Sequence, residues 1–332
     1  MTDAPLRIGI LGAARIAPMA LVRPARRVPE AAVVAVAARD AQRAQAFAAK
    51  HGIALVHPTY DALLADPAID AIYNPLPNSL HCEWSIRALQ AGKHVLCEKP
   101  IAANAAEATR MAEAAAHSGR VLMEAFHWRY HPLAARMREI IDAGEIGAVR
   151  HIEAHFCIPL LRPGDIRYHL DLAGGATMDV GCYAISILRF LAGAEPEVVD
   201  AAARLSSPGV DRYMEARLRF ADGRSGRITC ALLSAILLRA SARVGGTAGE
   251  LAVLNPIAPQ FFHRLSVRTE RGTRSERVRG EATYVYQLRA FVAAVRSHAP
   301  LPTGARDAIA NMRVIDAIYA KAGLPLRGSA RS

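Results

Sequence analysis

The stretch that decides the fold is Ile8-Gly9-Ile10-Leu11-Gly12-Ala13-Ala14-Arg15-Ile16-Ala17, where an apolar strand runs into a turn of small residues and then a helix. It is a weakened dinucleotide-binding fingerprint, because Gly12 keeps the first glycine of GxGxxG and alanine stands at the other two positions. Small residues in a turn can serve packing alone, but the place of this turn in the first strand–helix unit favours phosphate binding at the helix start. The residues predicted to contact the dinucleotide here are Gly12, Ala14, Arg15, Ile16 and Ala17.

Short apolar runs alternate with helical segments rich in Ala, Arg and Glu over the first third of the chain. Strands that are apolar throughout are typical of a parallel sheet covered by helices on both faces. The sequence therefore predicts an α/β protein that begins with a doubly wound Rossmann sheet. The predicted strands are Leu6–Leu11, Ala32–Ala37, Ala71–Tyr73, His94–Cys97 and Val121–Met123.

The pattern changes after about Ala125, where helices give way to a long series of period-two segments and then to two closing helices. A chain of 332 residues is about twice the length of one domain, so two domains are expected. We expect a Rossmann domain over 1–125 and a substrate-binding α+β domain with a large, mostly antiparallel open sheet over 126–332, its last helices able to pack back on the first domain. The predicted helices are Leu133–Ala143, Asp179–Leu191, Tyr284–Ser297 and Ala305–Ala322.

The net charge of +11 raises the question of a nucleic-acid partner. The densest basic run, Arg264–Arg279, alternates charge with Val, Leu and Thr around Arg271-Gly272, which favours a solvated two-stranded hairpin. No aromatic interleaving or helix-turn-helix pattern accompanies the run. We therefore predict no nucleic-acid partner.

Cysteine usage and hydropathy indicate the compartment. The five cysteines are scattered and form no CxxC pair, so reduced thiols are expected rather than a disulfide framework. No run approaches the roughly 18 apolar residues of a membrane helix, and no signal-peptide pattern precedes the first strand. These features predict a cytoplasmic protein with no membrane partner.

The second predicted strand ends in Ala37-Ala38-Arg39-Asp40, at the point where a carboxylate normally meets the ribose 2′-hydroxyl of NAD. A neutral tip followed by Arg39 removes the repulsion of a 2′-phosphate and offers it a bidentate guanidinium. NADP is thus favoured over NAD. The alternative, that Arg39 only caps a surface turn, stays open because 37 of the 41 basic residues are arginine.

Lysine is scarce, with four in the chain, and one of them occupies a decisive place. Lys99 stands in Glu98-Lys99-Pro100, directly beyond the strand that ends at Cys97, and open α/β sheets bind ligands at this edge. Pro100 keeps the preceding residue extended. An amine can be tuned by burial whereas a guanidinium stays protonated, so a site lysine is predicted here.

The loop Asn74-Pro75-Leu76-Pro77-Asn78-Ser79-Leu80-His81 follows the third predicted strand, and its two prolines stiffen it beside the cofactor crevice. Asn74, Pro75, Asn78 and His81 are predicted to contact the dinucleotide. Asn78 or Ser79 could instead cap the helix that begins near His81.

The second domain contains Gly174-Gly175-Ala176-Thr177-Met178-Asp179-Val180-Gly181-Cys182-Tyr183. Asp179 and Tyr183 are four apart and share a face if the segment is α-helical. The rest of this helix is apolar nearly all round, so it is expected to be buried, and a buried carboxylate needs a partner.

A metal site is considered for two pairs of histidines four residues apart, His127/His131 and His151/His155. Neither pair has a third ligand at a fixed offset, so no metal site is predicted.

Together these stretches, with Glu124-Ala125-Phe126-His127-Trp128-Arg129-Tyr130-His131-Pro132, resemble the Gfo/Idh/MocA family of oxidoreductases. The resemblance implies that Lys99, in the Glu98-Lys99-Pro100 triplet, lies beside the nicotinamide and that Arg129, His131 and Arg167 line the substrate pocket. Glu98 and Lys99 are accordingly predicted to contact the cofactor, and Asp179 and Tyr183 to contact the substrate. Many members have His where this chain has Tyr183. In having tyrosine at this position, the chain resembles the branch of the family that contains glucose-fructose oxidoreductase, NADP-dependent xylose dehydrogenase and dimeric dihydrodiol dehydrogenase. In that branch tyrosine is the acid/base and NADP is the common cofactor.

The resulting hypothesis is an NADP-dependent oxidoreductase acting on a CH–OH or C=O group of a sugar or polyol-like substrate, with Lys99, Asp179 and Tyr183 catalytic. The first alternative is an NADPH-dependent ketoreductase of a nucleotide-linked deoxysugar, and the second is a non-catalytic NADP-sensing protein. A homodimer or homotetramer through the C-terminal sheet is expected.

Overall fold

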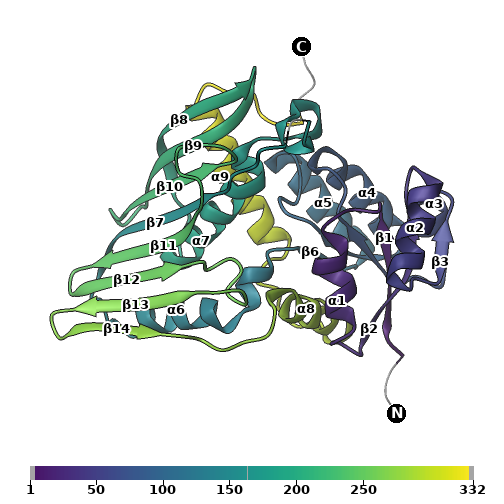
Figure 1. Cartoon of the computed structure of the whole chain (residues 1–332), viewed down its shortest axis with the longest axis horizontal. Helices are drawn as coiled ribbons and strands as arrows, with labels where there is room; N and C mark the ends of the chain where they lie inside the picture. Colours follow the sequence, from purple (N-terminus) through teal and green to yellow (C-terminus); the bar gives the residue numbers. More distant parts are fainter. Residues whose placement is uncertain (1–3, 163, 329–332) are drawn as a thin grey trace. The chain divides into compact units, whose positions relative to one another are not determined.

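The computed structural model describes residues 4–162 and 164–328. They form two compact units, of which the first comprises the residues up to Arg129 together with Tyr284–Ile309. The second comprises Tyr130–Thr283 and the residues from Ala310 on, so the division runs through helix α9 (Ala305–Lys321). Each unit is built around one sheet (Figure 1).

The first unit contains a six-stranded parallel sheet in the order β3-β2-β1-β4-β5-β6. This is the strand order of a doubly wound Rossmann fold, which confirms the predicted fold class. The strands are β1 (Leu6–Leu11), β2 (Ala31–Ala37), β3 (Leu55–His57), β4 (Ala71–Asn74), β5 (His94–Cys97) and β6 (Leu122–Glu124). The main helices are α1 (Arg23–Ala25), α2 (Ala41–His51), α3 (Tyr60–Ala65), α4 (Asn78–Gln90), α5 (Ala105–Ser118) and α8 (Thr283–Ser297).

The second unit contains an eight-stranded sheet in the order β14-β13-β12-β11-β7-β10-β9-β8. Only β7 and β10 run parallel to each other among these pairs, so the sheet is mostly antiparallel as predicted. Its strands are β7 (Val149–Cys157), β8 (Glu197–Ser207), β9 (Val210–Arg219), β10 (Ser225–Ala231), β11 (Arg239–Gly246), β12 (Gly249–Leu254), β13 (Arg264–Thr269) and β14 (Gly272–Glu276). The basic run folds as the β13–β14 hairpin.

Helix α7 (Cys182–Ala192) packs on the centre of this sheet, against β7, β10 and β11, and α6 (Pro132–Asp142) packs beside it. Ten of its eleven side chains are buried, which explains why the sequence is apolar nearly all round. One helical stretch of the described residues, Leu170–Ala192, is long and apolar enough to cross a membrane, but 89% of its most apolar window is buried inside the fold. It is the core helix of this unit.

The segment before α7 corrects one detail of the prediction. A regular helix was expected over Asp179–Leu191, but Thr177–Gly181 forms a π-helical turn and the α-helix begins only at Cys182. Asp179 thus lies in the π-helical turn and Tyr183 in the first turn of the α-helix that follows, so the two residues do not belong to one regular helix. Such π-helical turns are frequent at functional sites.

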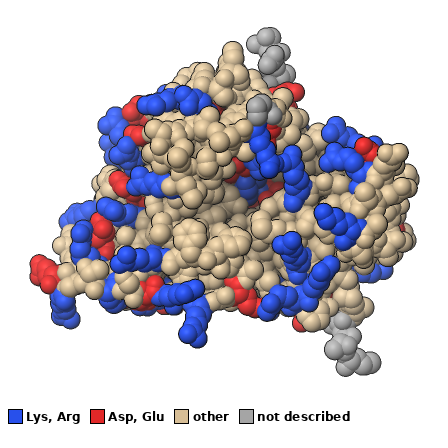
Figure 2. Space-filling view, in the orientation of Figure 1, with Lys and Arg blue, Asp and Glu red and all other residues tan. Residues whose placement is uncertain are grey.

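Lys and Arg side chains are spread over the face shown in Figure 2, with Asp and Glu among them. On the sheet of the second unit the charges alternate in sign, as in the ion pairs Arg227–Glu215 (2.8 Å) and Arg243–Glu250 (3.6 Å). Much of the positive charge of the second unit therefore sits in short-range pairs.

Candidate functional site

The turn after β1 has the geometry of a phosphate-binding turn. Gly12 has φ +82°, and its N–H donates to the carbonyl of Ala37 over 2.6 Å. A Cβ at Gly12 would lie 3.1 Å from Leu76 Cδ2, so a side chain here would be strained and crowded. Ala14, Arg15, Ile16 and Ala17 follow in the same turn, where Arg15 is exposed and Ala17 is fully buried. These residues fit a dinucleotide whose pyrophosphate approaches the backbone.

A cationic and aromatic corner stands at the tip of β2. Ala37 and Ala38 are buried there and carry no carboxylate, while Arg39 is exposed. Tyr60, at the start of α3, lies close to this tip: burial raises the pKa of its phenol, and the charges of Arg39 and Arg43 lower it again. Two guanidinium groups and a tyrosine thus lie close together at the end of β2, where the 2′-phosphate contact was predicted.

The loop after β4 is held by its own polar side chains. Asn74 is fully buried, and its amide nitrogen donates to the carbonyl of His81 (3.2 Å) and to Ser85 Oγ (3.0 Å). The ring nitrogens of His81 lie 2.8 Å from the carbonyl of Pro100 and 2.7 Å from that of Leu76. Burial lowers the pKa of His81 to about 4, so its imidazole is neutral near pH 7. A neutral imidazole has one N–H, so His81 donates a hydrogen bond to one of these two carbonyls, and its ring lies between this loop and the segment that follows Lys99.

The other predicted residues of this loop lie at the start of α4. The helix begins at Asn78 rather than near His81, and the cap residue is Pro77, which offers no side-chain hydrogen bond. Asn78 and Pro75 thus stand at the carboxyl edge of the sheet, where the dinucleotide was predicted, without the capping role considered for Asn78.

Lys99 follows β5 in a segment that neighbouring side chains fix in place. Glu98 is buried and accepts a hydrogen bond of 2.7 Å from the hydroxyl of Tyr73. Beyond Pro100, the N–H of Ile101 donates to Glu124 Oε1 over 2.8 Å. The N–H of Glu98 also donates to the carbonyl of Asn74 over 3.0 Å, so the backbone is anchored on both sides of Lys99 and gives its side chain a fixed origin.

A neutral histidine lies near this lysine. Burial, and secondly the positive charge of Lys99, lower the pKa of His127 to about 3. The His127 ring packs on Tyr284 of α8, with ring centroids 4.1 Å apart. The imidazole stays uncharged at neutral pH, so it does not repel an ammonium group at Lys99. No local pattern in the sequence predicted that Tyr73 and Tyr284 lie near Lys99 and His127.

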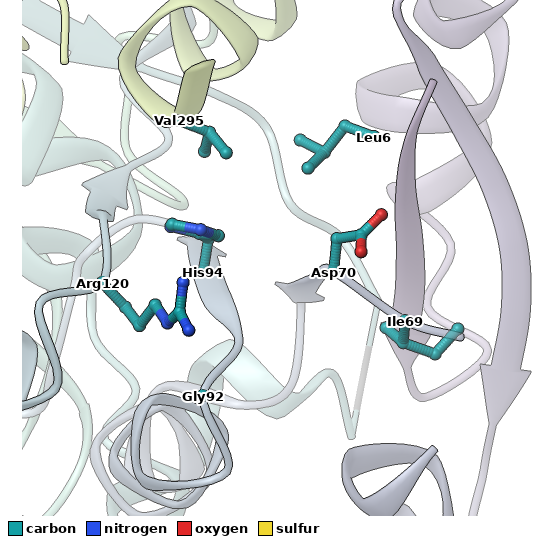
Figure 3. A pocket seen from close by; sticks show the side chains of 7 residues that line it. All are labelled: Leu6, Ile69, Asp70, Gly92, His94, Arg120 and Val295. Atoms are coloured by element: carbon teal, nitrogen blue, oxygen red, sulfur yellow. The ribbon is translucent and has the colours of Figure 1, made fainter. Parts of the chain in front are cut away.

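A separate cavity lies at the opposite edge of the Rossmann sheet (Figure 3). It has a volume of about 290 Å³ and is lined by the amino-terminal ends of strands, including Leu6 of β1 and His94 of β5, with Asp70, Arg120 and Val295. Ligands of open α/β sheets bind outside the carboxyl ends of the strands. This cavity is therefore distinct from the dinucleotide region.

In the second unit, the structure shows that the partner of Asp179 is Arg167. Arg167 Nε lies 2.8 Å from Asp179 Oδ2, and the negative charge of Asp179 raises the pKa of Arg167. Arg167 Nη1 also donates to Asp165 over 3.1 Å. The structure thus brings together two predicted site residues, Asp179 and Arg167. The Asp179 side chain is 14% exposed rather than fully buried, and the arginine supplies its charged partner.

Tyr183 lies in the first turn of α7 and is 5% exposed. Its ring packs edge to face on Phe156 of β7, with centroids 5.6 Å apart and the planes at 87°. This contact fixes the direction of the ring while a small part of the side chain stays open to solvent. The sequence pattern did not identify Phe156, because a single aromatic residue in a strand is ordinary core.

The histidine predicted in the substrate pocket has a structural contact. His131 Nδ1 accepts a hydrogen bond of 3.1 Å from the N–H of Leu133 and so caps α6. Burial lowers the pKa of His131 to about 4. Arg129, two residues earlier, ends the first unit, and its guanidinium lies 5.6 Å from the Trp128 ring centroid.

A Rossmann sheet with a glycine turn, an anchored lysine past the fifth strand, and a second α/β unit carrying an aspartate–arginine pair and a tyrosine define a dinucleotide-dependent oxidoreductase. Two family models match the chain, "Oxidoreductase family, NAD-binding Rossmann fold" over residues 6–126 and "GFO/IDH/MocA C-terminal domain" over residues 134–252. The chain belongs to the Gfo/Idh/MocA oxidoreductase family.

Characterised proteins resemble the chain over most of its length. The NADP-dependent D-xylose 1-dehydrogenase 2 of Haloferax volcanii is 36% identical over 96% of this chain and 97% of its own. A dTDP-3,4-didehydro-2,6-dideoxy-alpha-D-glucose 3-reductase of Streptomyces violaceoruber is 38% identical over 88% and 85%. The structure of a 3-ketoreductase from Actinomadura kijaniata, in complex with NADP and TDP-benzene, superposes with a TM-score of 0.89 at 30% identity over 96% and 98%.

Proposed function

We propose that this protein is an NADP-dependent oxidoreductase that transfers hydride between the nicotinamide and a CH–OH or C=O group of a sugar or polyol-like substrate. The observation that carries the proposal is the anchored segment around Lys99, which sits at the ligand-binding edge of a Rossmann sheet. Relatives that share 36–38% identity act on sugars or sugar nucleotides by name, which supports the substrate class.

NADP is the cofactor that both the structure and the relatives support. The tip of β2 lacks a carboxylate, and Arg39 and Arg43 bring positive charge to Tyr60 beside it. The xylose dehydrogenase is named for NADP, and the ketoreductase structure contains NADP. We propose Arg39 as the residue that contacts the 2′-phosphate, because it is the exposed guanidinium directly after the neutral tip.

The chemical roles follow from the residue types. Bound NADP supplies or accepts the hydride. Tyr183 holds the proton at its phenol oxygen, giving it to a substrate carbonyl in reduction and taking it from a hydroxyl in oxidation. Lys99, as an ammonium, stabilises negative charge that develops on the substrate oxygen. Asp179, paired with Arg167, orients a substrate hydroxyl.

Variants of a solved relative support these two assignments. Structures of the Actinomadura kijaniata ketoreductase include one variant with a lysine replaced and one with a tyrosine replaced by phenylalanine, both with TDP-benzene and NADP. That lysine and tyrosine are separated by as many residues as Lys99 and Tyr183 in this chain. We infer that Lys99 and Tyr183 are their counterparts.

A second candidate is an NADPH-dependent ketoreductase of a nucleotide-linked deoxysugar. It is favoured by the 38% identity to a dTDP-sugar 3-reductase and by the superposition with a relative that binds TDP-benzene. The two candidates share the chemistry at the reacting carbon and differ in whether a nucleoside diphosphate is bound. Activity on dTDP-linked keto-sugars but not on free sugars would select the second.

We further propose that the protein is cytoplasmic and assembles as a homodimer or homotetramer through its eight-stranded sheet. Helix α7 covers one face of this sheet, and the ion pairs Arg227–Glu215 and Arg243–Glu250 lie on its strands. Light scattering coupled to gel filtration tests the oligomer, and a monomer at all concentrations would contradict it.

The deciding experiment tests first which cofactor the protein binds and then which substrate it converts. Thermal unfolding is followed with NADPH and with NADH at equal concentration, and a larger rise in melting temperature is expected with NADPH, since only a ligand of the native state stabilises it. Absorbance of NADPH is then followed with aldoses, inositols, dihydrodiols and keto-sugars. Binding of NADPH without turnover of any of them would indicate a cofactor-sensing protein instead.

A further inference from the structure

A fully buried ion pair lies beneath the loop that leads to Asp179. Arg327, which follows α9, and Asp211 of β9 are both 0% exposed, and Arg327 Nη2 lies 2.9 Å from Asp211 Oδ1. Two charges removed completely from water carry a large desolvation cost, so such a pair persists only where its remaining hydrogen-bonding groups are satisfied.

Asp211 is satisfied by the entry to the π-helical turn. Its Oδ2 accepts hydrogen bonds of 2.7 Å from both the N–H and the hydroxyl of Thr177, the first residue of that turn. Its Oδ1 accepts a further bond of 3.0 Å from the hydroxyl of Tyr319 in α9. The carboxylate therefore ties the start of the turn to the last helix of the chain.

Arg327 is satisfied by the same loop. Its Nε donates to the carbonyl of Gly174 over 2.7 Å and its Nη1 to the carbonyl of Pro325 over 2.9 Å. The guanidinium also lies over the Tyr319 ring, 4.0 Å from the centroid. The four side chains of Arg327, Asp211, Tyr319 and Thr177 are called the Arg327 clamp below.

Gly175 shows how closely the clamp fits the loop. Its φ is +129°, and a Cβ there would lie 2.1 Å from Asp211 Oδ1 and 3.0 Å from Arg327 Nη2. Only glycine can adopt this conformation in this space. The second glycine of the Gly174-Gly175 pair is thus required by the clamp.

The clamp reaches both partners of the Asp179–Arg167 pair through backbone bonds. The N–H of Gly175 donates to the carbonyl of Arg167 over 2.8 Å, and the N–H of Asp179 donates to the carbonyl of Gly175 over 3.0 Å. A shift of the glycine loop would move Arg167 and Asp179 together, and the turn continues directly into the helix of Tyr183.

We propose that Arg327, acting through Asp211, is a positioning residue of the reaction that holds the Asp179–Arg167 pair and the first turn of α7 in their working geometry. This inference rests on the proposed function. A buried ion pair adds little to stability compared with an apolar replacement, whereas a fully satisfied polar network fixes one arrangement of the chain.

The test uses full-length variants Arg327→Met, Arg327→Lys, Asp211→Asn and Tyr319→Phe. The matched control is Arg189→Met, because Arg189 is also a buried arginine of the second unit, paired with Glu195 at 2.7 Å and bonded to Asn311. For Arg327→Met we expect kcat to fall about tenfold to a hundredfold, the effect of small misplacement of reacting groups. Affinity for NADPH should stay unchanged, because Arg327 lies in the unit without the Rossmann sheet.

Arg327→Lys should retain more kcat than Arg327→Met. Two further variants, Arg327→Ala and its control Arg189→Ala, test chemical rescue: methylguanidinium should partly restore kcat in the first but not in the second. Hydrogen–deuterium exchange of the amides from Gly174 to Tyr183 should be faster in Arg327→Met than in the wild type and in Arg189→Met. The proposal would be wrong if hydrogen exchange of these amides were unchanged in both Arg327→Met and Asp211→Asn. It would also be wrong if exchange became faster in these variants while kcat stayed at the wild-type value.

The exchange experiment does not depend on turnover. A wild-type protein that converts none of the substrates would contradict the proposed function, while the exchange rates would still show whether the clamp holds the loop. If the Arg327 or Asp211 variants fail to fold, Tyr319→Phe still tests the Arg327 clamp, because it removes only one hydroxyl and one hydrogen bond.

Discussion

Arg167 Nε lies 2.8 Å from Asp179 Oδ2, and this ion pair joins a loop arginine to the π-helical turn that precedes the helix of Tyr183. The Asp179 side chain is only 14% exposed, and a largely buried carboxylate needs a charged or hydrogen-bonding partner. Because Asp165 also binds Arg167, the arginine is itself held in place.

A double-mutant cycle tests whether this pair acts as a unit. Asp179→Asn and Arg167→Met should each lower kcat/KM, and the double variant should be less impaired than the sum of the two effects. The Arg167 side chain is 41% exposed, so solvent screening puts the coupling at the low end, about 0.5–1 kcal/mol. Asp165→Asn is the control, since it contacts Arg167 outside the turn. If the two effects on kcat/KM were strictly additive, Asp179 and Arg167 would not act as a unit.

Replacement of the proposed acid and of the site lysine tests the chemistry. Tyr183→Phe and Lys99→Met should each reduce kcat by at least about a hundredfold, because a general acid/base contributes about 10² to 10⁴ in rate. NADPH should still stabilise both variants against heat. Tyr213→Phe is a matched control, as its hydroxyl bonds Glu215 on the sheet. Near-full activity of both site variants would refute the assignment.

The sequence predicted the parts of the fold that carry strong periodicity. Its apolar runs located five of the six Rossmann strands, but β3 (Leu55–His57) escaped because its residues are exposed or half-buried at the sheet edge. The edge strand β8 (Glu197–Ser207) was missed for the same reason. The parallel pairing of β7 with β10 depends on contacts between distant segments, which no local pattern encodes.

The sequence predicted which residue types the candidate site contains, but it did not predict which residues they interact with. Asp179 was expected to need a partner, yet nothing in the local pattern distinguished Arg167 from the other arginines. Arg327 was not identified because arginine dominates the basic residues of this chain and is ordinarily a surface residue. Its burial follows from Asp211, more than 100 residues away.

Cofactor preference provides the third prediction. Arg39→Ala should lower kcat/KM for NADPH relative to NADH by roughly tenfold to a hundredfold, which corresponds to the loss of about 1.5–3 kcal/mol from a charged hydrogen bond. Ala38→Asp should shift the ratio further toward NADH by placing a carboxylate at the tip of β2. Arg110→Ala, at an exposed arginine of α5, is the control. An unchanged ratio in Arg39→Ala would leave the 2′-phosphate to another residue.

Buried neutral histidines should make stability fall on acidification. Burial lowers the pKa of His127 to about 3 and the pKa values of His81 and His131 to about 4, whereas a histidine in the unfolded chain titrates near about 6.5. Between about pH 6.5 and about pH 4 the unfolded chain therefore binds protons that the native protein does not. The stability contributed by these groups is fully present above that window and is lost as the pH falls through it.

Urea unfolding at several values from about pH 7 to about pH 4.5 measures this effect, with a slope of up to about 1.4 kcal/mol per pH unit for each histidine. The carboxylate of Glu276, whose pKa is lowered to about 2 by Arg136 and Arg274, loses its stabilising effect only at more acid pH. His131→Asn provides the control, because asparagine can still cap α6 while one titrating group is removed. The variant should show a shallower pH slope than the wild type. An identical slope in both proteins would mean that His131 is not a neutral group in the native state.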